Sequence, residues 1–342
     1  MTLRRAPTLL TMLILAAALM LPRSVAAQSG DRAGDRAGEL LNAIVNVKAE
    51  VPAEARTARF LGTERQGSGG VVDGNGLVLT IGYLILEASG AVVTGADGSQ
   101  IPAGIVAYDH ETGFGLIKAR RPLGVEPIRF GRSAELNVRD QVLIVSRGGA
   151  QPISTAQVVS RRAFAGAWEY LLEKAIFTSP PHAFHSGAAL LGPDGRLLGI
   201  GSLFVGDSSG LGHPLPGNMF VPIDELKPVF ADLLSKGRRA GPYRPWIGAN
   251  TQEFHSRVIV SRVSPGGPAA RAGIEPGDMI LGVGGIPVSG QADYFRKLWN
   301  SWEAGDMVPL NVLRRGAASL TSEEIDVRSM DRYDWLRLDN SL

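Results

Sequence analysis

Short apolar segments separated by turn-forming residues run through the first two thirds of the chain, and they constrain its fold more than any other feature. Turn signals such as Asp73-Gly74-Asn75-Gly76 separate them. Many short strands at regular spacing predict an antiparallel barrel or sandwich, so we expect a mainly β fold class. The 342 residues suffice for two domains. The expected strands lie at 43–51, 71–72, 77–80, 91–94, 101–108, 114–119, 141–146 and 154–161.

The first 27 residues have the composition of a secretory signal peptide rather than of a folded segment. Arg4 and Arg5 precede an apolar run over 9–21, and Val25-Ala26-Ala27 forms a small-residue cleavage site. The run is too short to span a bilayer easily. We therefore expect export with no stable membrane span after cleavage, followed by a flexible linker over 28–42.

Charge and side-chain inventory exclude several function classes. The formal net charge of +2 owes three positive charges to Arg4, Arg5 and Arg23 of the signal segment, so it indicates no nucleic-acid partner. The chain has no cysteine, which excludes disulfides and thiolate chemistry. Its five histidines are scattered without a metal-ligand spacing, so we predict neither a metal site nor a cofactor.

One stretch, Thr178 to Gly201, places a hydroxyl on a tight turn. Ser186 and Gly187 form that turn, a buried apolar strand over 188–191 follows, and a hairpin turn leads to a return strand. A serine in this position can be a nucleophile only if a base activates it. Taken alone, the stretch fits an ordinary Ser-Gly turn better than a nucleophile.

The last third of the chain predicts a second domain. Residues 43–237 form the first domain, which a helix over Ile223–Lys236 closes. A Pro- and Gly-rich linker precedes the second domain at 241–328, and residues 329–342 form a tail without a clear pattern. The second domain should contain strands at 257–263, 279–283 and 308–314 and an amphipathic helix at 291–302.

In this order, the pieces resemble the HtrA (DegP-like) family of exported trypsin-like serine proteases with a PDZ domain. Three motifs carry the resemblance: G-S-G-G-V-V-D-G-N-G-L-V-L-T, H-S-G-A-A-L-L-G-P-D-G-R-L-L-G-I and V-S-R-V-S-P-G-G-P-A-A-R-A-G-I-E-P-G-D-M-I-L. The resemblance implies two six-stranded β-barrels with the catalytic site between them, then a PDZ domain. It also implies a periplasmic location and leaves a homo-oligomer open.

The resemblance further assigns the three positions of a catalytic triad. The family's histidine falls on Tyr83 of L-T-I-G-Y, its aspartate on Gly113 of G-F-G-L-I-K, and its serine on Ser186. A phenol with a pKa near 10 is protonated at neutral pH and cannot serve as the base. Gly113 has no side chain to orient an imidazole. The oxyanion-hole amides would be those of Ser186 and Phe184, where the family has glycine.

Two functions follow from these substitutions. The first is a pseudoprotease that binds peptides or segments of unfolded exported proteins as a chaperone, adaptor or regulator. The second is an active serine endopeptidase in which His185, His182 or His110 replaces the missing base. The PDZ half looks intact, because Arg244-Pro245 and the following residues match the family's carboxylate-binding loop. Its peptide-binding residues would be Trp246, Ile247, Gly248 and Ala249.

Overall fold

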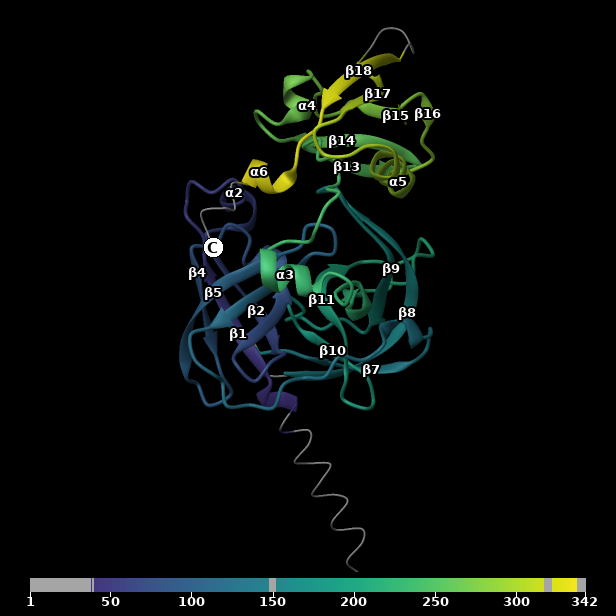
Figure 1. Ribbon diagram of the computed structural model, residues 1–342. Helices are drawn as coiled ribbons and strands as arrows, with labels where there is room; N and C mark the ends of the chain where they lie inside the picture. Colours follow the sequence, from purple (N-terminus) through teal and green to yellow (C-terminus); the bar gives the residue numbers. More distant parts are fainter. Residues whose placement is uncertain (1–37, 39, 148–151, 317–321, 337–342) are drawn as a thin grey trace, which may run out of the picture.

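The computed structural model describes residue 38 and residues 40–147, 152–316 and 322–336. The predicted signal peptide, nearly all of the predicted linker and the end of the tail lie outside these residues. No helix in the described ranges is long and apolar enough to cross a membrane. The mainly β fold class is confirmed, since two closed barrels and a separate sheet hold most of the regular secondary structure of the described chain (Figure 1).

The first barrel closes in the order β1-β2-β3-β6-β5-β4. All of its pairs are antiparallel, and β1 closes it by pairing with both β2 and β4. The short helix α2 (Ala58–Leu61) lies between β1 and β2. Its strands are β1 (Ile44–Glu50), β2 (Glu64–Val71), β3 (Leu77–Ile81), β4 (Gly90–Thr94), β5 (Gln100–Tyr108) and β6 (Phe114–Ala119).

The second barrel closes in the order β10-β11-β12-β9-β8-β7. Its β8–β9 pair is long and reaches beyond the barrel toward the C-terminal domain (Figure 1). Sequence patterns missed β9, although its apolar residues are buried. The strands are β7 (Gln141–Val145), β8 (Ile153–Gly166), β9 (Tyr170–Ser179), β10 (Ala189–Leu191), β11 (Leu197–Val205) and β12 (Gly217–Pro222).

The helix predicted over Ile223–Lys236 is wrong in its extent. The segment begins with a 3-10 turn, η3 (Ile223–Glu225), and the α-helix α3 covers only Phe230–Lys236. Pro228 explains the interruption, because proline lacks the N–H that a continuous helix needs. Gly237 ends α3 in the left-handed conformation, with φ of 72°.

The C-terminal domain is a sheet with the order β13-β14-β15-β17-β18, in which β13 is an edge strand. Helix α5 (Gln291–Ser301) packs on this sheet, and the short α4 (Pro268–Arg271) lies at its other end. The described part of the predicted tail, residues 329–336, contains helix α6 (Arg332–Leu336). The strands are β13 (Ala249–Phe254), β14 (Arg257–Val263), β15 (Met279–Val283), β16 (Ile286–Pro287), β17 (Met307–Leu313) and β18 (Glu323–Arg328).

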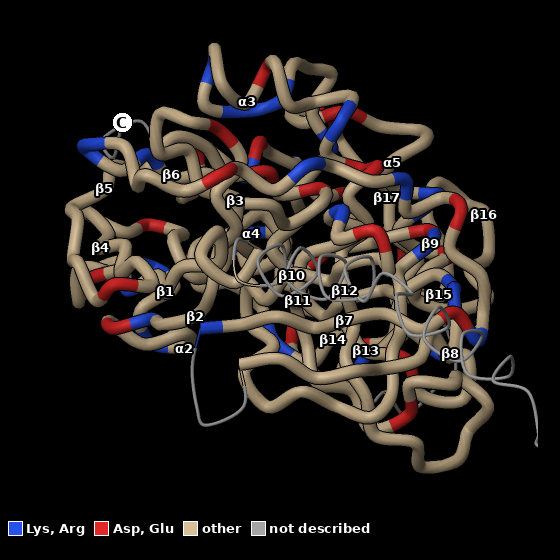
Figure 2. Tube along the Cα trace, turned by 90° about the horizontal axis from the view of Figure 1, so that it is seen from below, with Lys and Arg blue, Asp and Glu red and all other residues tan. Residues whose placement is uncertain are grey.

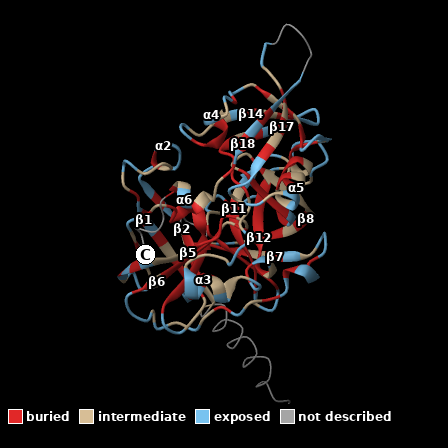
Figure 3. Ribbon diagram, turned by 45° about the horizontal axis from the view of Figure 1, so that its top comes forward, coloured by how far each residue is buried: buried red, intermediate tan, exposed pale blue. Residues whose placement is uncertain are grey.

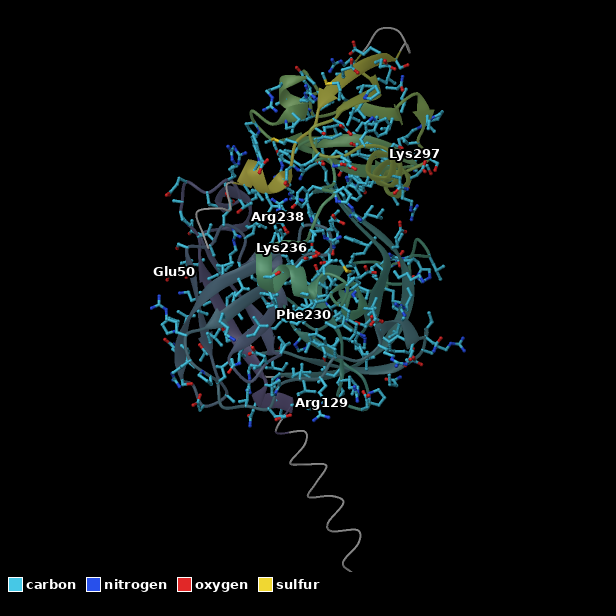
Figure 4. The ribbon with its side chains drawn as sticks, viewed as in Figure 1. Glu50, Arg129, Phe230, Lys236, Arg238 and Lys297 are labelled. Carbon is cyan, nitrogen blue, oxygen red and sulfur yellow. The ribbon has the colours of Figure 1, made fainter. Side chains whose placement is uncertain are left out.

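Buried residues fill the barrels and line the inner face of the C-terminal sheet (Figure 3). Positive and negative residues alternate along the outside of the trace (Figure 2). Arg238, labelled in Figure 4, lies between α3 and the C-terminal domain, where its guanidinium pairs with Asp331 at 2.5 Å. Arg239 reaches back to the first barrel and pairs with fully buried Asp109 at 2.8 Å. The two halves are therefore joined by ion pairs as well as by the chain.

Candidate functional site

Tyr83 and Ser186 meet between the two barrels. Tyr83 lies in the 3-10 turn η1 (Gly82–Leu84), directly after β3, and Ser186 lies on the turn before β10. The Tyr83 hydroxyl is 2.8 Å from the Ser186 Oγ and 2.8 Å from the carbonyl oxygen of Ser202 on β11. Both side chains are half-buried. The position assigned to a base therefore holds a phenol in contact with the assigned nucleophile.

Which hydroxyl donates in each of these two hydrogen bonds follows from the groups that can only accept a proton. A carbonyl oxygen only accepts hydrogen bonds, so the Ser202 carbonyl takes the single proton of the Tyr83 hydroxyl. When Tyr83 donates there, Ser186 donates its own proton to the phenol oxygen. Burial raises the pKa of Tyr83 to about 12, and the hydrogen bond with Ser186 only partly opposes this. At pH 7 only about one phenol in 10⁵ is ionised, so Tyr83 cannot take the serine proton efficiently.

Gly113, which the resemblance assigns to the aspartate position, has a backbone conformation that other residues avoid. Its φ is +84°, and its carbonyl accepts the amide proton of Gly82 at 2.7 Å. A Cβ added there would lie 3.3 Å from the hydroxyl oxygen of Tyr170. Tyr170 itself donates to the carbonyl of Thr112 at 2.5 Å. A tyrosine from β9 thus fills the space next to the missing carboxylate, and no aspartate fits without strain.

Phe184 and Ser186 mark the assigned oxyanion-hole position. Gly187 beside them has φ of +73°, and a Cβ there would meet the Ser68 carbonyl. Phe184 is not among the described non-glycine residues with positive φ, and half of its side chain is exposed. The backbone at Phe184 therefore stays in the region open to any residue, so the special conformations that a glycine permits there are not used.

None of the three candidate replacement bases makes a described hydrogen bond to Ser186. The Nε2 of His182 is 2.8 Å from Ser146 Oγ, and its Nδ1 is 3.0 Å from Ser154 Oγ. His110 is buried between two tyrosine rings, and burial lowers its pKa well below the usual range. Burial also lowers the pKa of His185, whose Nδ1 is buried without a partner among the described residues. The Ser186 hydroxyl has Tyr83 as its described hydrogen-bond partner.

Asp109 cannot supply the missing carboxylate. Its Oδ2 accepts the Thr112 hydroxyl proton at 2.6 Å, and Arg239 approaches both carboxylate oxygens, at 2.9 and 2.8 Å. The side chain is fully buried in this network. Asp109 therefore belongs to the junction of the two domains.

The loop assigned to peptide binding already holds a carboxylate from another part of the chain. The amides of Ile247, Gly248 and Ala249 donate to the side chain of Glu169 at 2.9, 2.6 and 3.0 Å. Trp246 lies beside them and is buried, with its ring 5.0 Å from that of Trp335. The three amides converge on one anion, as a carboxylate-binding loop requires.

The segment next to Glu169, at the turn between β8 and β9, lies along the edge of β13. The Thr251 amide donates to the carbonyl of Ala167 at 2.9 Å. Gln291, the first residue of α5, is buried and donates to the Thr251 carbonyl at 2.8 Å and to the Gly166 carbonyl at 3.4 Å. The hairpin tip between β8 and β9 therefore lies between β13 and α5.

Family models match both halves of the chain. A trypsin-like peptidase domain matches residues 67–200, and a PDZ domain matches residues 245–324. The serine protease Do-like HtrA of Bacillus subtilis (strain 168) is 24% identical over 296 residues, covering 77% of this chain and 64% of the relative. The periplasmic serine endoprotease DegP of Salmonella typhimurium is 27% identical over 286 residues, covering 78% and 58% respectively. The chain thus spans about three fifths of these relatives.

Solved structures show the same fold. The HtrA-type protease AlgW with a decapeptide gives a TM-score of 0.54 at 19% identity, over 87% of this chain and 98% of the other. The serine endoprotease from Yersinia pestis gives 0.50 at 22% identity, over 86% and 97%. These findings confirm the resemblance that the three motifs predict.

Several site residues escaped the sequence patterns. Tyr170, Ser202 and Glu169 shape the two sites, yet each comes from a segment far along the chain from the residues it contacts. Only Glu169 gave a local signal, because it is a charged residue next to apolar ones at the tip of a hairpin. That signal does not identify a partner more than 70 residues away.

Proposed function

Because the chain pairs a trypsin-like peptidase domain with a PDZ domain, as HtrA/DegP-like serine proteases do, we propose that it binds polypeptides without cleaving them. The pseudoprotease half supplies the scaffold, and the PDZ half holds free C-termini or extended segments of exported proteins. A role as chaperone, adaptor or regulator of an active relative fits this division.

One observation carries the proposal: the hydrogen bond between Tyr83 and Ser186. A working serine nucleophile needs a base that accepts its proton during attack and returns it to the leaving amine. Tyr83 stays protonated at neutral pH, because burial raises its pKa to about 12. Loss of one triad member already lowers turnover by about 10⁴ to 10⁶. An endopeptidase with another base would need a histidine on Ser186, and none of the described histidines makes that contact.

The binding half of the proposal rests on the loop of Ile247, Gly248 and Ala249. Its three amides point at a carboxylate, the group that ends every polypeptide. Strand β13 is an edge strand of its sheet, and such an edge can add an extended peptide as another strand, which supplies main-chain hydrogen bonds of low sequence dependence. Arg244 and Trp246 line a pocket together with Glu169, the residue that the loop amides contact.

The proposal places the protein in the periplasm. The N-terminal segment has the pattern of a signal peptide. DegP of Salmonella typhimurium and DegQ of Escherichia coli are both named periplasmic. Exported proteins would then be the polypeptides within reach.

Two assays on the chain from residue 28 onwards test the proposal together. Casein turnover should be the same for the wild type and for Ser186→Ala, because the serine does no chemistry. A mixture of fluorescein-labelled octapeptides of random sequence should bind at least about tenfold better with free carboxylates than as C-terminal amides.

The two assays separate the proposal from its rival. Turnover that disappears in Ser186→Ala would establish the active endopeptidase. Equal binding of carboxylates and amides would remove the PDZ loop as a receptor for C-termini.

A further inference from the structure

The β8–β9 hairpin tip, residues 166–169, lies in the groove where a peptide would bind. Its Glu169 carboxylate receives the three amides of the loop, and its Ala167 carbonyl receives the amide of Thr251 on β13. An added peptide needs the same groups: the loop amides for its carboxylate and the β13 edge for its backbone. The tip and a bound peptide cannot use them at once.

Glu169 is buried to a degree unusual for a glutamate, with 6% of its surface exposed. A buried carboxylate is costly unless hydrogen bonds satisfy it. Here backbone amides from a different domain supply three such bonds, and Arg332 on α6 lies close enough to favour the charged form. The contact is therefore built around the carboxylate group itself.

The backbone conformation of Glu169 indicates that the turn itself would favour a glycine at this position, so the glutamate side chain has another role. Gly166 and Tyr170 pair across the hairpin, so three residues form the loop. The last residue of such a loop takes the left-handed conformation, which favours glycine. Glu169 adopts it, with φ of +58°. A non-glycine residue in this region is strained, and such positions gather at functional contacts.

Other groups hold the tip in the groove. Arg332 donates to the Trp168 carbonyl at 3.0 Å, and the Trp168 ring stacks on Tyr170 with centroids 5.4 Å apart. Leu171, next on β9, is buried within the apolar cluster of the PDZ domain, which also contains Phe295 and Leu298 of α5. An apolar side chain of the hairpin thus joins the cluster that lines the groove.

We propose that the hairpin tip is an internal ligand of the PDZ domain, in which the Glu169 side chain takes the place of a peptide C-terminal carboxylate and keeps the groove closed. This inference rests on the proposed peptide-binding function and adds its regulation. A free C-terminus must displace residues 166–169 before it can bind. The apparent affinity for peptides is the intrinsic affinity multiplied by the fraction of molecules in which the tip is undocked.

Two variants release the tip in different ways. Glu169→Gly removes the carboxylate and places the preferred residue at the left-handed position, so the hairpin itself should form at least as well. Glu169→Gln keeps the size of the side chain but replaces one of the two acceptor oxygens that face the loop amides by an NH2 group, which donates. The matched control is Glu173→Gln on the same strand, which removes an exposed ion pair with Arg296 of α5 and leaves the loop untouched.

Hydrogen exchange tests the docked tip without any ligand. The amides of Ile247, Gly248 and Ala249 should exchange about tenfold or more faster in Glu169→Gly than in the wild type, because they lose a charged acceptor. Exchange in Glu173→Gln should stay at the wild-type rate. Equal exchange of these three amides in all proteins would overturn the proposal.

Peptide binding tests the consequence. With the free-carboxylate octapeptide mixture, Glu169→Gly should bind about ten- to hundredfold more tightly than the wild type, and Glu169→Gln should lie between them. Unchanged affinity in Glu169→Gly would contradict self-occupancy even if the wild type binds. A third outcome separates the two claims: the loop amides exchange faster in Glu169→Gly, but neither the wild type nor the variant prefers peptides with a free carboxylate. In that case the tip is docked in the wild type, but the groove does not bind C-termini. The proposed function would then fail, whereas the contact of the tip would stand.

Discussion

At the scale of single residues, the proposed function gives the contact around Ser186 a structural rather than a chemical role. Tyr83 joins two segments of the second barrel by bonding both the Ser186 hydroxyl and the Ser202 carbonyl. Tyr170 fills the space beside Gly113 and donates to Thr112. The two tyrosines connect the barrels where a protease would place a base and its orienting carboxylate.

This interpretation predicts how two substitutions compare in stability. Tyr83→Phe leaves both the Ser202 carbonyl and the Ser186 hydroxyl without their partner and should lower the free energy of unfolding by roughly 1 to 3 kcal/mol. Ser186→Ala keeps the bond from Tyr83 to Ser202 and should cost less. Chemical denaturation of both variants measures the difference. A larger loss in Ser186→Ala than in Tyr83→Phe would show that the serine has the stronger structural role.

The sequence allowed Tyr83, Gly113 and Ser186 to be placed because each lies inside a recognisable local motif. It could not show Tyr170 or Ser202 beside them, because those contacts depend on how β9 and β11 of the second barrel pack against the first barrel. Local motifs fix positions along one strand, whereas the neighbours across a barrel follow from its closure.

At the scale of elements, the β8–β9 hairpin performs two tasks. Its lower part completes the second barrel, and its tip enters the groove of the PDZ domain. Sequence patterns missed β9 and gave β8 only in part, because the hairpin extends past the barrel and its tip is covered by another domain. The loop at 247–249 was predictable from its own motif, but its occupant was not.

The buried carboxylate makes the docked tip sensitive to pH. Burial raises the pKa of Glu169 to about 7, against which the three amides and Arg332 act only in part. The docked state therefore holds its proton more tightly than a free tip, whose pKa would be near 4.5. Docking is strongest below that value and weakens as the pH rises through 7.

The prediction is that peptide affinity rises with pH. Between pH 5.5 and pH 8 the wild type should bind the free-carboxylate octapeptides roughly tenfold or more better, whereas Glu169→Gly should show a flat profile. Fluorescence anisotropy across this range measures both. Parallel slopes in the two proteins would assign the dependence to other groups facing the junction: Arg239, Arg244, Arg332, Asp109, Glu111, His110, Asp331, Tyr243, Tyr294 and Tyr333.

At the scale of the whole molecule, the two halves are held in a fixed relation around this hairpin. Arg239 ties the segment after α3 to buried Asp109 of the first barrel. Helix α6 follows the PDZ domain in the chain and contacts the protease-like half. Its Tyr333 hydroxyl donates to the Tyr108 carbonyl, and its Arg332 guanidinium donates to the Trp168 carbonyl. The tail showed no pattern in the sequence, because a short helix packed between two domains needs no amphipathic repeat.

The order of the domains along the chain was predictable from the sequence, but the way they pack against each other was not. Three motifs sufficed to expect two barrels followed by a PDZ domain. The docking surface instead combines single residues from the β8–β9 hairpin, the segment after α3 and α6, and each of these residues is unremarkable in its own stretch.

The central claim is that Ser186 is not a nucleophile, and labelling with a fluorophosphonate probe tests it most directly. Such a probe bonds covalently to a serine only where a base and an oxyanion hole activate it. The chain from residue 28 onwards should label no more than its Ser186→Ala variant, at pH values on both sides of 7. Labelling that depends on Ser186 would contradict the account and identify an active serine endopeptidase.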